Sequence, residues 1–125
     1  MSIAISNEQL NRPTALSSAA FKFNRMVFTS GNVGIDYENN TYKDSIQEQT
    51  IQAIENLKTT LAAAGSSLEE VIKVSLFISD IKYSTTVNEI YQKYFTSKPA
   101  RYCVSVKFPN DKIKIELDCV AICAE

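Results

Sequence analysis

The hydrophobic positions of the chain change their spacing several times, and each change marks a new structural element. Residues 45–64 repeat apolar side chains at helical spacing and begin with a Ser-Ile-Gln-Glu capping box. Residues 71–79 alternate apolar and polar side chains, as a half-buried strand does. The pattern also predicts strand structure within residues 19–30 and a second helix over residues 86–95.

Two more alternating segments follow the second predicted helix. The first has apolar positions Tyr102, Val104, Val106 and Phe108, interleaved with Arg101, Cys103, Ser105 and Lys107. Alternation resumes at Ile113 and places Glu116 among the polar positions. The turn signal Pro109–Asp111 separates the segments, so we predict an antiparallel hairpin with Arg101 and Glu116 together on the face away from the core.

The order of predicted elements is β-β-α-β-α-β-β, which is typical of an α+β fold with two helices on one face of a mixed sheet. We expect one domain over residues 1–125. The second face of the sheet would carry a mixed set of side chains: Lys73, Ser75, Phe77, Arg101, Cys103, Ser105 and Glu116. This set is too polar for a core and too mixed for a bare solvent face, so we expect a partner subunit to cover it.

Composition indicates a small folded domain and argues against two classes of partner. Apolar residues make up 45% of the 125 residues, and 13 basic and 14 acidic side chains leave a net charge of −1. Because no Lys/Arg cluster stands out, we do not expect nucleic-acid binding. No segment reaches the roughly 18 apolar residues of a membrane span, and residues 1–5 lack a basic leader, so we expect a cytoplasmic protein.

The chain contains no histidine, which removes several mechanisms. A Ser-His-Asp triad, a Cys-His pair and an HExxH metal helix are all excluded. The three cysteines, Cys103, Cys119 and Cys123, lack CxxC spacing and are expected to be reduced thiols. We predict no metal site, and Cys103 has more the character of a small hydrophobic residue than of a nucleophile.

Four motifs, in this order and spacing, carry a family resemblance. They are Thr29-Ser30-Gly31 at the end of an early strand, Asn88-Glu89-Ile90-Tyr91 in a helix, Pro99-Ala100-Arg101 before a strand, and Glu116 on the next strand. Together they resemble the RidA/YjgF family of reactive-intermediate imine deaminases, whose members also carry the label L-PSP endoribonuclease. The resemblance extends over residues 21–122.

The resemblance implies a fold, an assembly and an activity. The fold is chorismate-mutase-like, the assembly is a homotrimer, and the active sites lie in the three clefts between subunits. The implied reaction is hydrolysis of 2-imino acids, such as 2-iminopropanoate and 2-iminobutanoate, to 2-keto acids and ammonia without a cofactor. The arginine matched by Arg101 holds the substrate carboxylate, and the glutamate matched by Glu116 activates water. Ser30, Gly31, Asn88 and the Cys103 carbonyl are matched to the same pocket.

Read from the residues alone, other roles stay open. Arg101 also fits a solvated surface group, and Glu116 also fits a cross-strand partner of Lys107 or Lys114. Asn88 also fits the polar face of a helix. The chain differs from the family pattern at Ser17, where the deaminases have a pocket tyrosine, and at Asn32, Gly34 and Tyr102. Two alternative functions are an endoribonuclease acting on single-stranded RNA and a non-catalytic protein that binds small carboxylates.

Overall fold

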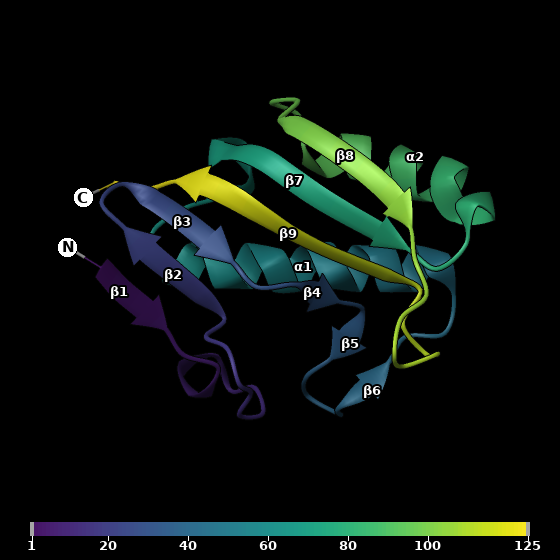
Figure 1. Ribbon diagram of the computed structural model, residues 1–125, viewed down its shortest axis with the longest axis horizontal. Coiled ribbons are helices and arrows are strands. Elements are labelled where there is room, and N and C mark those ends of the chain that lie inside the picture. Colours follow the sequence, from purple (N-terminus) through teal and green to yellow (C-terminus); the bar gives the residue numbers. More distant parts are fainter. Residues whose placement is uncertain (1, 125) are drawn as a thin grey trace.

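The helices α1 and α2 lie on one face of a twisted sheet in the computed structural model, which describes residues 2–124 (Figure 1). The strands are β1 Ser2–Ile5, β2 Ala20–Phe23, β3 Met26–Thr29, β4 Asn32–Val33, β5 Ile35–Asp36, β6 Thr41–Tyr42, β7 Val71–Ile78, β8 Ala100–Ser105 and β9 Ile115–Ile122. The helices are α1 Ile46–Ala63 and α2 Ser84–Tyr94, with 3-10 turns at Glu8–Leu10, Leu68–Glu70 and Ile81–Tyr83. The predicted α+β fold and its order of main elements are confirmed. The terminal residues of the predicted domain, Met1 and Glu125, lie outside the described residues.

The main sheet is mixed and has the strand order β1-β2-β3-β9-β7-β8, with the short β4 also paired to β9. β7 and β8 run parallel because α2 forms the crossover between them, and the other neighbours in the sheet are antiparallel. β5 and β6 form a separate two-stranded hairpin beside the start of α1 (Figure 1).

α1 forms where the sequence predicts it. The Ser45 hydroxyl accepts a hydrogen bond from the Glu48 backbone N–H, and the Glu48 side chain accepts one from the Ser45 N–H, which completes the capping box. Gly65 follows the helix with φ of 78°, a conformation that glycine adopts without strain. Leu57 and Leu61 are fully buried against the sheet, so the apolar stripe of α1 forms the centre of the core.

The predicted hairpin between the last two strands is wrong. Among the strands of residues 2–124, β8 lies at the edge of the sheet and pairs only with β7, whereas β9 lies between β3 and β7. The segment 106–114 therefore carries the chain from the edge of the sheet to its middle rather than around a tight turn. The physical reason is that the βαβ crossover places β8 beside β7, and the long apolar face of β9 then fills the central position between β7 and β3.

The faces of β8 are also the reverse of the prediction. Tyr102 and Val104 point away from the helices and remain 47% and 41% exposed, whereas Arg101 and Cys103 lie on the helix side, opposite Val74 and Leu76. The alternation of residues 101–105 is that of a strand, but alternation alone does not say which face of the strand is covered. The face of the sheet away from the helices is thus more apolar than predicted; its exposed large residues are Phe21, Phe23, Met26, Phe28, Tyr102 and Val104.

None of the helices within residues 2–124 is long and apolar enough to cross a membrane.

Candidate functional site

Arg101 is held in place by two residues of α2. Its Nη1 donates a hydrogen bond of 2.9 Å to Oδ1 of Asn88, and its Cζ lies 4.7 Å from the centroid of the Tyr91 ring. Asn88 and Tyr91 are three residues apart on the helix and so present both groups to the same side. The guanidinium is exposed, and apart from these contacts its donors face solvent. The predicted site residues Arg101 and Asn88 are therefore brought together.

The ring of Tyr91 packs against the Arg101 guanidinium, a contact that the sequence does not predict. Its ring stacks on Phe95 with centroids 4.3 Å apart, and its hydroxyl is buried without a hydrogen-bond partner among the described residues. Burial raises the pKa of this phenol to about 12, so the ring stays neutral at physiological pH. A neutral ring face favours a cation above it, which fixes Arg101 without neutralising its charge.

Cys103 follows Arg101 on the same face of β8. Its side chain is half-buried, and burial raises the pKa of the thiol despite the nearby Arg101 charge. The thiol is therefore protonated near neutral pH, which agrees with the prediction that Cys103 is not a nucleophile. Cys119, on β9, is buried, and its thiol pKa rises to about 12 for the same reason.

Glu116 lies with Ser30 and Gly31 in a second cluster. β4 pairs with β9 so that Val33 is opposite Glu116. This pairing places the Gly31 backbone next to the Glu116 carboxylate. A Cβ at residue 31 would lie 2.7 Å from Cδ of Glu116, so only glycine allows this approach. Ser30 adjoins the cluster and donates a hydrogen bond of 2.6 Å to the Ser18 carbonyl.

The environment of Glu116 makes it a better base than an exposed carboxylate. Partial burial raises its pKa, and the neighbouring Asp118 carboxylate, two residues along on the same face of β9, raises it further. Asp118 has a raised pKa as well, mainly because of its own burial. A carboxylate with a raised pKa binds a proton more readily, which is what general-base chemistry requires.

The two clusters occupy opposite faces of the sheet within one chain. Arg101 is opposite Val74, whose side chain is in the core under the helices, and Glu116 is opposite Phe77, which points to the other face. The prediction that Arg101 and Glu116 share a face is therefore wrong, because β8 is a parallel edge strand and not the hairpin partner of β9. Ser30, Gly31 and Glu116 form one half of the predicted site, and Asn88, Arg101 and Cys103 form the other.

A separate cavity adjoins each half. One of about 320 Å³ is lined by Tyr91, Lys98 and Arg101 with their neighbours, and one of about 280 Å³ is lined by Arg12, Ser30 and Gly31 with theirs. A larger hollow of about 940 Å³ is lined by Lys43, Lys112 and Lys114 with their neighbours. No predicted site residue lines it. Within residues 2–124, no three His, Cys, Asp or Glu side chains gather as a metal site would require.

Sequence comparison matches this chain to known proteins over almost its whole length. The profile of the family described as Endoribonuclease L-PSP matches residues 9–123. The protein HMF1 of Saccharomyces cerevisiae is 38% identical over 105 residues, which cover 83% of this chain and 81% of HMF1. A RutC family protein of Pyrococcus abyssi is 38% identical over 120 residues, covering 94% of each chain.

Solved structures agree with the sequence matches. Yeast Mmf1 superimposes with a TM-score of 0.89 at 30% identity, covering 99% of this chain and all of Mmf1. The YjgF gene product of E. coli gives a TM-score of 0.86 at 27% identity, covering 96% and 98%. E. coli TdcF with bound serine gives a TM-score of 0.84 at 28% identity, covering 90% and 92%.

Proposed function

Because this chain belongs to the Endoribonuclease L-PSP family, which its relatives connect to the RutC and Rid proteins, we propose that it hydrolyses reactive 2-imino acids to 2-keto acids and ammonia. Suitable substrates are 2-iminopropanoate and 2-iminobutanoate. One observation carries the proposal: the chain presents a fixed, exposed guanidinium at Arg101 and a carboxylate of raised pKa at Glu116. These are a carboxylate-binding group and a general base.

The separation of the two clusters supports a site shared between subunits. Arg101 and Glu116 lie on opposite faces of one sheet and do not act on one small molecule within a chain. The face that carries Glu116 is also uncovered and exposes several aromatic residues, which favours burial against another copy. We infer a homotrimer in which Arg101 of one subunit faces Glu116 of the next, with more than about 1,000 Å² buried in each contact.

Each residue has a defined task in the proposed reaction. Arg101 binds the substrate carboxylate through two parallel N–H donors, which leaves C2 of the imine in a fixed position. Glu116 removes a proton from water as the water oxygen bonds to C2, and the C=N electron pair moves to nitrogen, which takes up a proton. The resulting carbinolamine collapses: its hydroxyl proton passes by way of Glu116 to the amino nitrogen, the C=O bond forms, the C2–N bond breaks and ammonia leaves. Water is consumed and no oxidant or reductant is needed.

This chemistry needs no nucleophilic side chain. An imine carbon is already electrophilic, so orientation and one base are sufficient, and the protonated thiol of Cys103 has no step to perform. That E. coli TdcF was solved with bound serine supports a small molecule with a carboxylate as the type of ligand.

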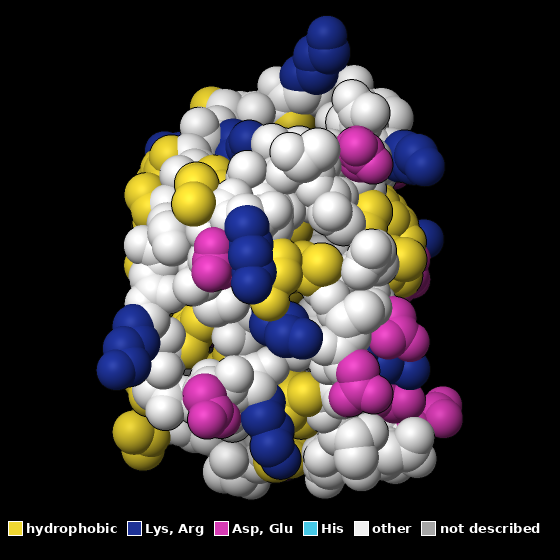
Figure 2. All heavy atoms as spheres, turned by 90° about the vertical axis from the view of Figure 1, so that its right-hand side faces the viewer, with side chains coloured by type: hydrophobic (Ala, Val, Ile, Leu, Met, Phe, Trp, Pro, Cys, Tyr) yellow, Lys and Arg dark blue, Asp and Glu magenta, His cyan; other side chains and the backbone are white. Residues whose placement is uncertain are grey.

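The family name favours RNA cleavage as a second candidate function. The charges argue against it. Figure 2, which views the molecule from the right-hand side of Figure 1, shows Lys and Arg side chains scattered among acidic, apolar and uncharged ones and not gathered into one basic surface on that end. A carboxylate-binding protein without catalysis would keep Arg101 but would not need the raised pKa of Glu116.

A direct assay separates these functions. The purified protein should accelerate keto-acid formation from 2-iminobutanoate, generated in situ by an amino-acid oxidase, without added metal or cofactor. Arg101→Lys keeps the charge but loses the planar pair of donors, so this variant should lose about 10²-fold in kcat/KM. Lys107→Arg, a change of the same type at an exposed position, serves as the matched control. If the wild-type protein and Arg101→Lys cut single-stranded RNA equally, and the wild-type protein does not accelerate imine hydrolysis, the nuclease function would replace this proposal.

A further inference from the structure

Arg12 is a buried cation without an anionic partner. Its side chain is 9% exposed, and no carboxylate of residues 2–124 lies within 4.0 Å of it. Nη1 donates a hydrogen bond of 2.8 Å to the Thr60 hydroxyl, and Nη2 donates one of 2.8 Å to the Asn56 carbonyl. Both partners are neutral, so the positive charge is left uncompensated. Such burial is unfavourable unless an anion approaches.

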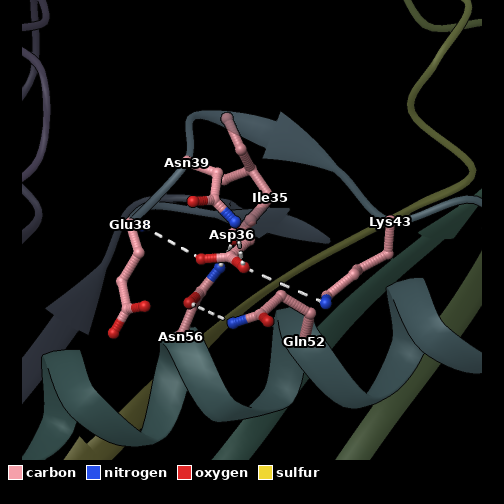
Figure 3. A network of polar contacts seen from close by, with 7 residues as sticks. All are labelled: Ile35, Asp36, Glu38, Asn39, Lys43, Gln52 and Asn56. Carbon is pink, nitrogen blue, oxygen red and sulfur yellow. Dashed lines mark hydrogen bonds and ion pairs between the residues drawn. The ribbon is translucent and has the colours of Figure 1, made fainter.

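Arg12 lies within a network of polar and aromatic contacts. The Tyr37 ring lies 4.8 Å from the Arg12 Cζ, on the turn between β5 and β6. Figure 3 shows the contacts within that hairpin segment: Asp36 accepts hydrogen bonds from the Glu38 backbone and the Asn39 side chain and pairs with Lys43 at 3.9 Å.

Asn56 completes the frame from the helix side. Its Nδ2 donates to the carbonyls of Val33 and Ile35 at 3.0 and 2.8 Å. Its Oδ1 accepts from Gln52 at 2.9 Å (Figure 3). The backbone carbonyl of the same residue binds Arg12. The guanidinium is thus bound to the same Asn56 that binds the backbone at Val33 and Ile35, at the start of the β5–β6 hairpin.

Arg12 lines the cavity that reaches the Glu116 cluster. The cavity has a volume of about 280 Å³, and Arg12 and Tyr37 contribute to its wall together with Ser17, Ser30 and Gly31. Gly31 is the residue whose backbone lies against the Glu116 carboxylate. Ser17 stands where the deaminases that this chain resembles have a tyrosine, so a small hydroxyl takes the place of a large ring in this wall.

We infer that the Arg12 cavity binds the side-chain carboxylate of an acidic 2-imino acid with four or five carbons, 2-iminosuccinate or 2-iminoglutarate. This inference rests on the proposed function. Arg101 of one subunit would hold the carboxylate next to the imine, and Arg12, in the same subunit as Glu116, would hold the distal carboxylate. The Ser17 and Ser30 hydroxyls supply further donors on the cavity wall. A neutral side chain would leave the Arg12 charge unpaired and would bind less well.

The test compares acidic with neutral ligands, so that a loss of folding does not imitate a loss of specificity. Binding of the stable products 2-oxoglutarate and 2-oxobutanoate is measured by calorimetry, and hydrolysis of the two matching imines is measured as kcat/KM. The wild-type protein should prefer the acidic member by about tenfold or more in both measurements. Arg12→Gln should remove the preference, and Arg25→Gln, the same change at an exposed position, should keep it.

A second variant leaves Arg12 and its hydrogen bonds in place. Ser17→Tyr fills the cavity and should lower affinity for 2-oxoglutarate while that for 2-oxobutanoate stays within about twofold. This variant decides the matter if Arg12→Gln does not fold. Equal binding of both keto acids by the wild type, or equal losses for both in the variants, would show that Arg12 only ties its loop to α1. If the acidic preference is found but no imine is hydrolysed, carboxylate binding in the Arg12 cavity is supported and the proposed reaction is wrong.

Discussion

The backbone of Gly31 lies directly against the Glu116 carboxylate, closer than any residue with a Cβ would allow. The contact joins two segments 85 positions apart through the short pairing of β4 with β9. It also contributes to the partial burial that raises the pKa of Glu116. In the proposed mechanism this contact sets where the base can reach water.

We therefore predict that Gly31→Ala removes activity without unfolding the protein. The added methyl group would push the Glu116 carboxylate out of its position, and a displacement of about 1 Å lowers turnover by about 10²-fold. The measurement is kcat with 2-iminobutanoate, with circular dichroism to verify folding. Gly65→Ala is a control that strains the backbone far from the clusters and should lower stability but not turnover. Normal turnover in Gly31→Ala would exclude the assigned position of the base.

A second prediction concerns pH. Glu116 must be ionised to accept a proton, so activity should fall as the pH drops through its raised pKa, at a higher pH than for an ordinary glutamate. Asp118→Asn removes the neighbouring negative charge and should lower the pKa of Glu116. The acid limb of the kcat/KM profile should then move to lower pH.

The control for this profile is Asp111→Asn, which removes a carboxylate from the exposed loop between β8 and β9. Its acid limb should coincide with that of the wild type. An acid limb that does not move in Asp118→Asn would mean that another group sets it.

The third prediction concerns the apolar face of the sheet. Phe28 lies on β3, beside Val120 of β9, and is 43% exposed. Phe28→Asp should turn the proposed trimer into monomers and remove most of the activity, because each proposed site needs two subunits. Sedimentation velocity at micromolar concentration gives the assembly state.

Ile81→Asp is the matched control for Phe28→Asp. Ile81 is 67% exposed in the turn before α2, so its replacement should leave assembly and activity unchanged. A wild-type protein that sediments as a monomer yet hydrolyses imines at full rate would refute the shared site.

The local elements could be predicted from the sequence, whereas the strand pairing could not. The capping box at Ser45 and the stop at Gly65 follow from neighbouring residues and are confirmed. The neighbours of β8 and β9 depend on a crossover and on which strand fills the middle of the sheet, and neither leaves a local signal. The alternation in β8 indicates a strand, but the covered face follows from where α2 packs, so the pattern does not reveal that Tyr102 and Val104 point away from the helices.

In the candidate site, too, some contacts can be predicted from local sequence and others cannot. The spacing of Asn88 and Tyr91 on one helix was a signal that both could support Arg101, although only Asn88 was assigned to the site. The contact of Gly31 with Glu116 and the burial of Arg12 come from segments distant in sequence. Such contacts depend on the tertiary fold, and no periodicity indicates them.

In the proposed assembly, Arg101 of one subunit and Glu116 of another form one active site. Two variants test it, Arg101→Lys and Glu116→Gln, each nearly inactive alone because every site lacks one group. When the two are unfolded, mixed in equal amounts and refolded together, about one site in four should combine an intact Arg101 with an intact Glu116, by random assembly of subunits in a closed ring. Native mass spectrometry verifies the mixed trimers. Turnover should recover to about a quarter of the wild-type value, and mixed trimers that stay inactive would rule out a site shared between Arg101 and Glu116 of different subunits.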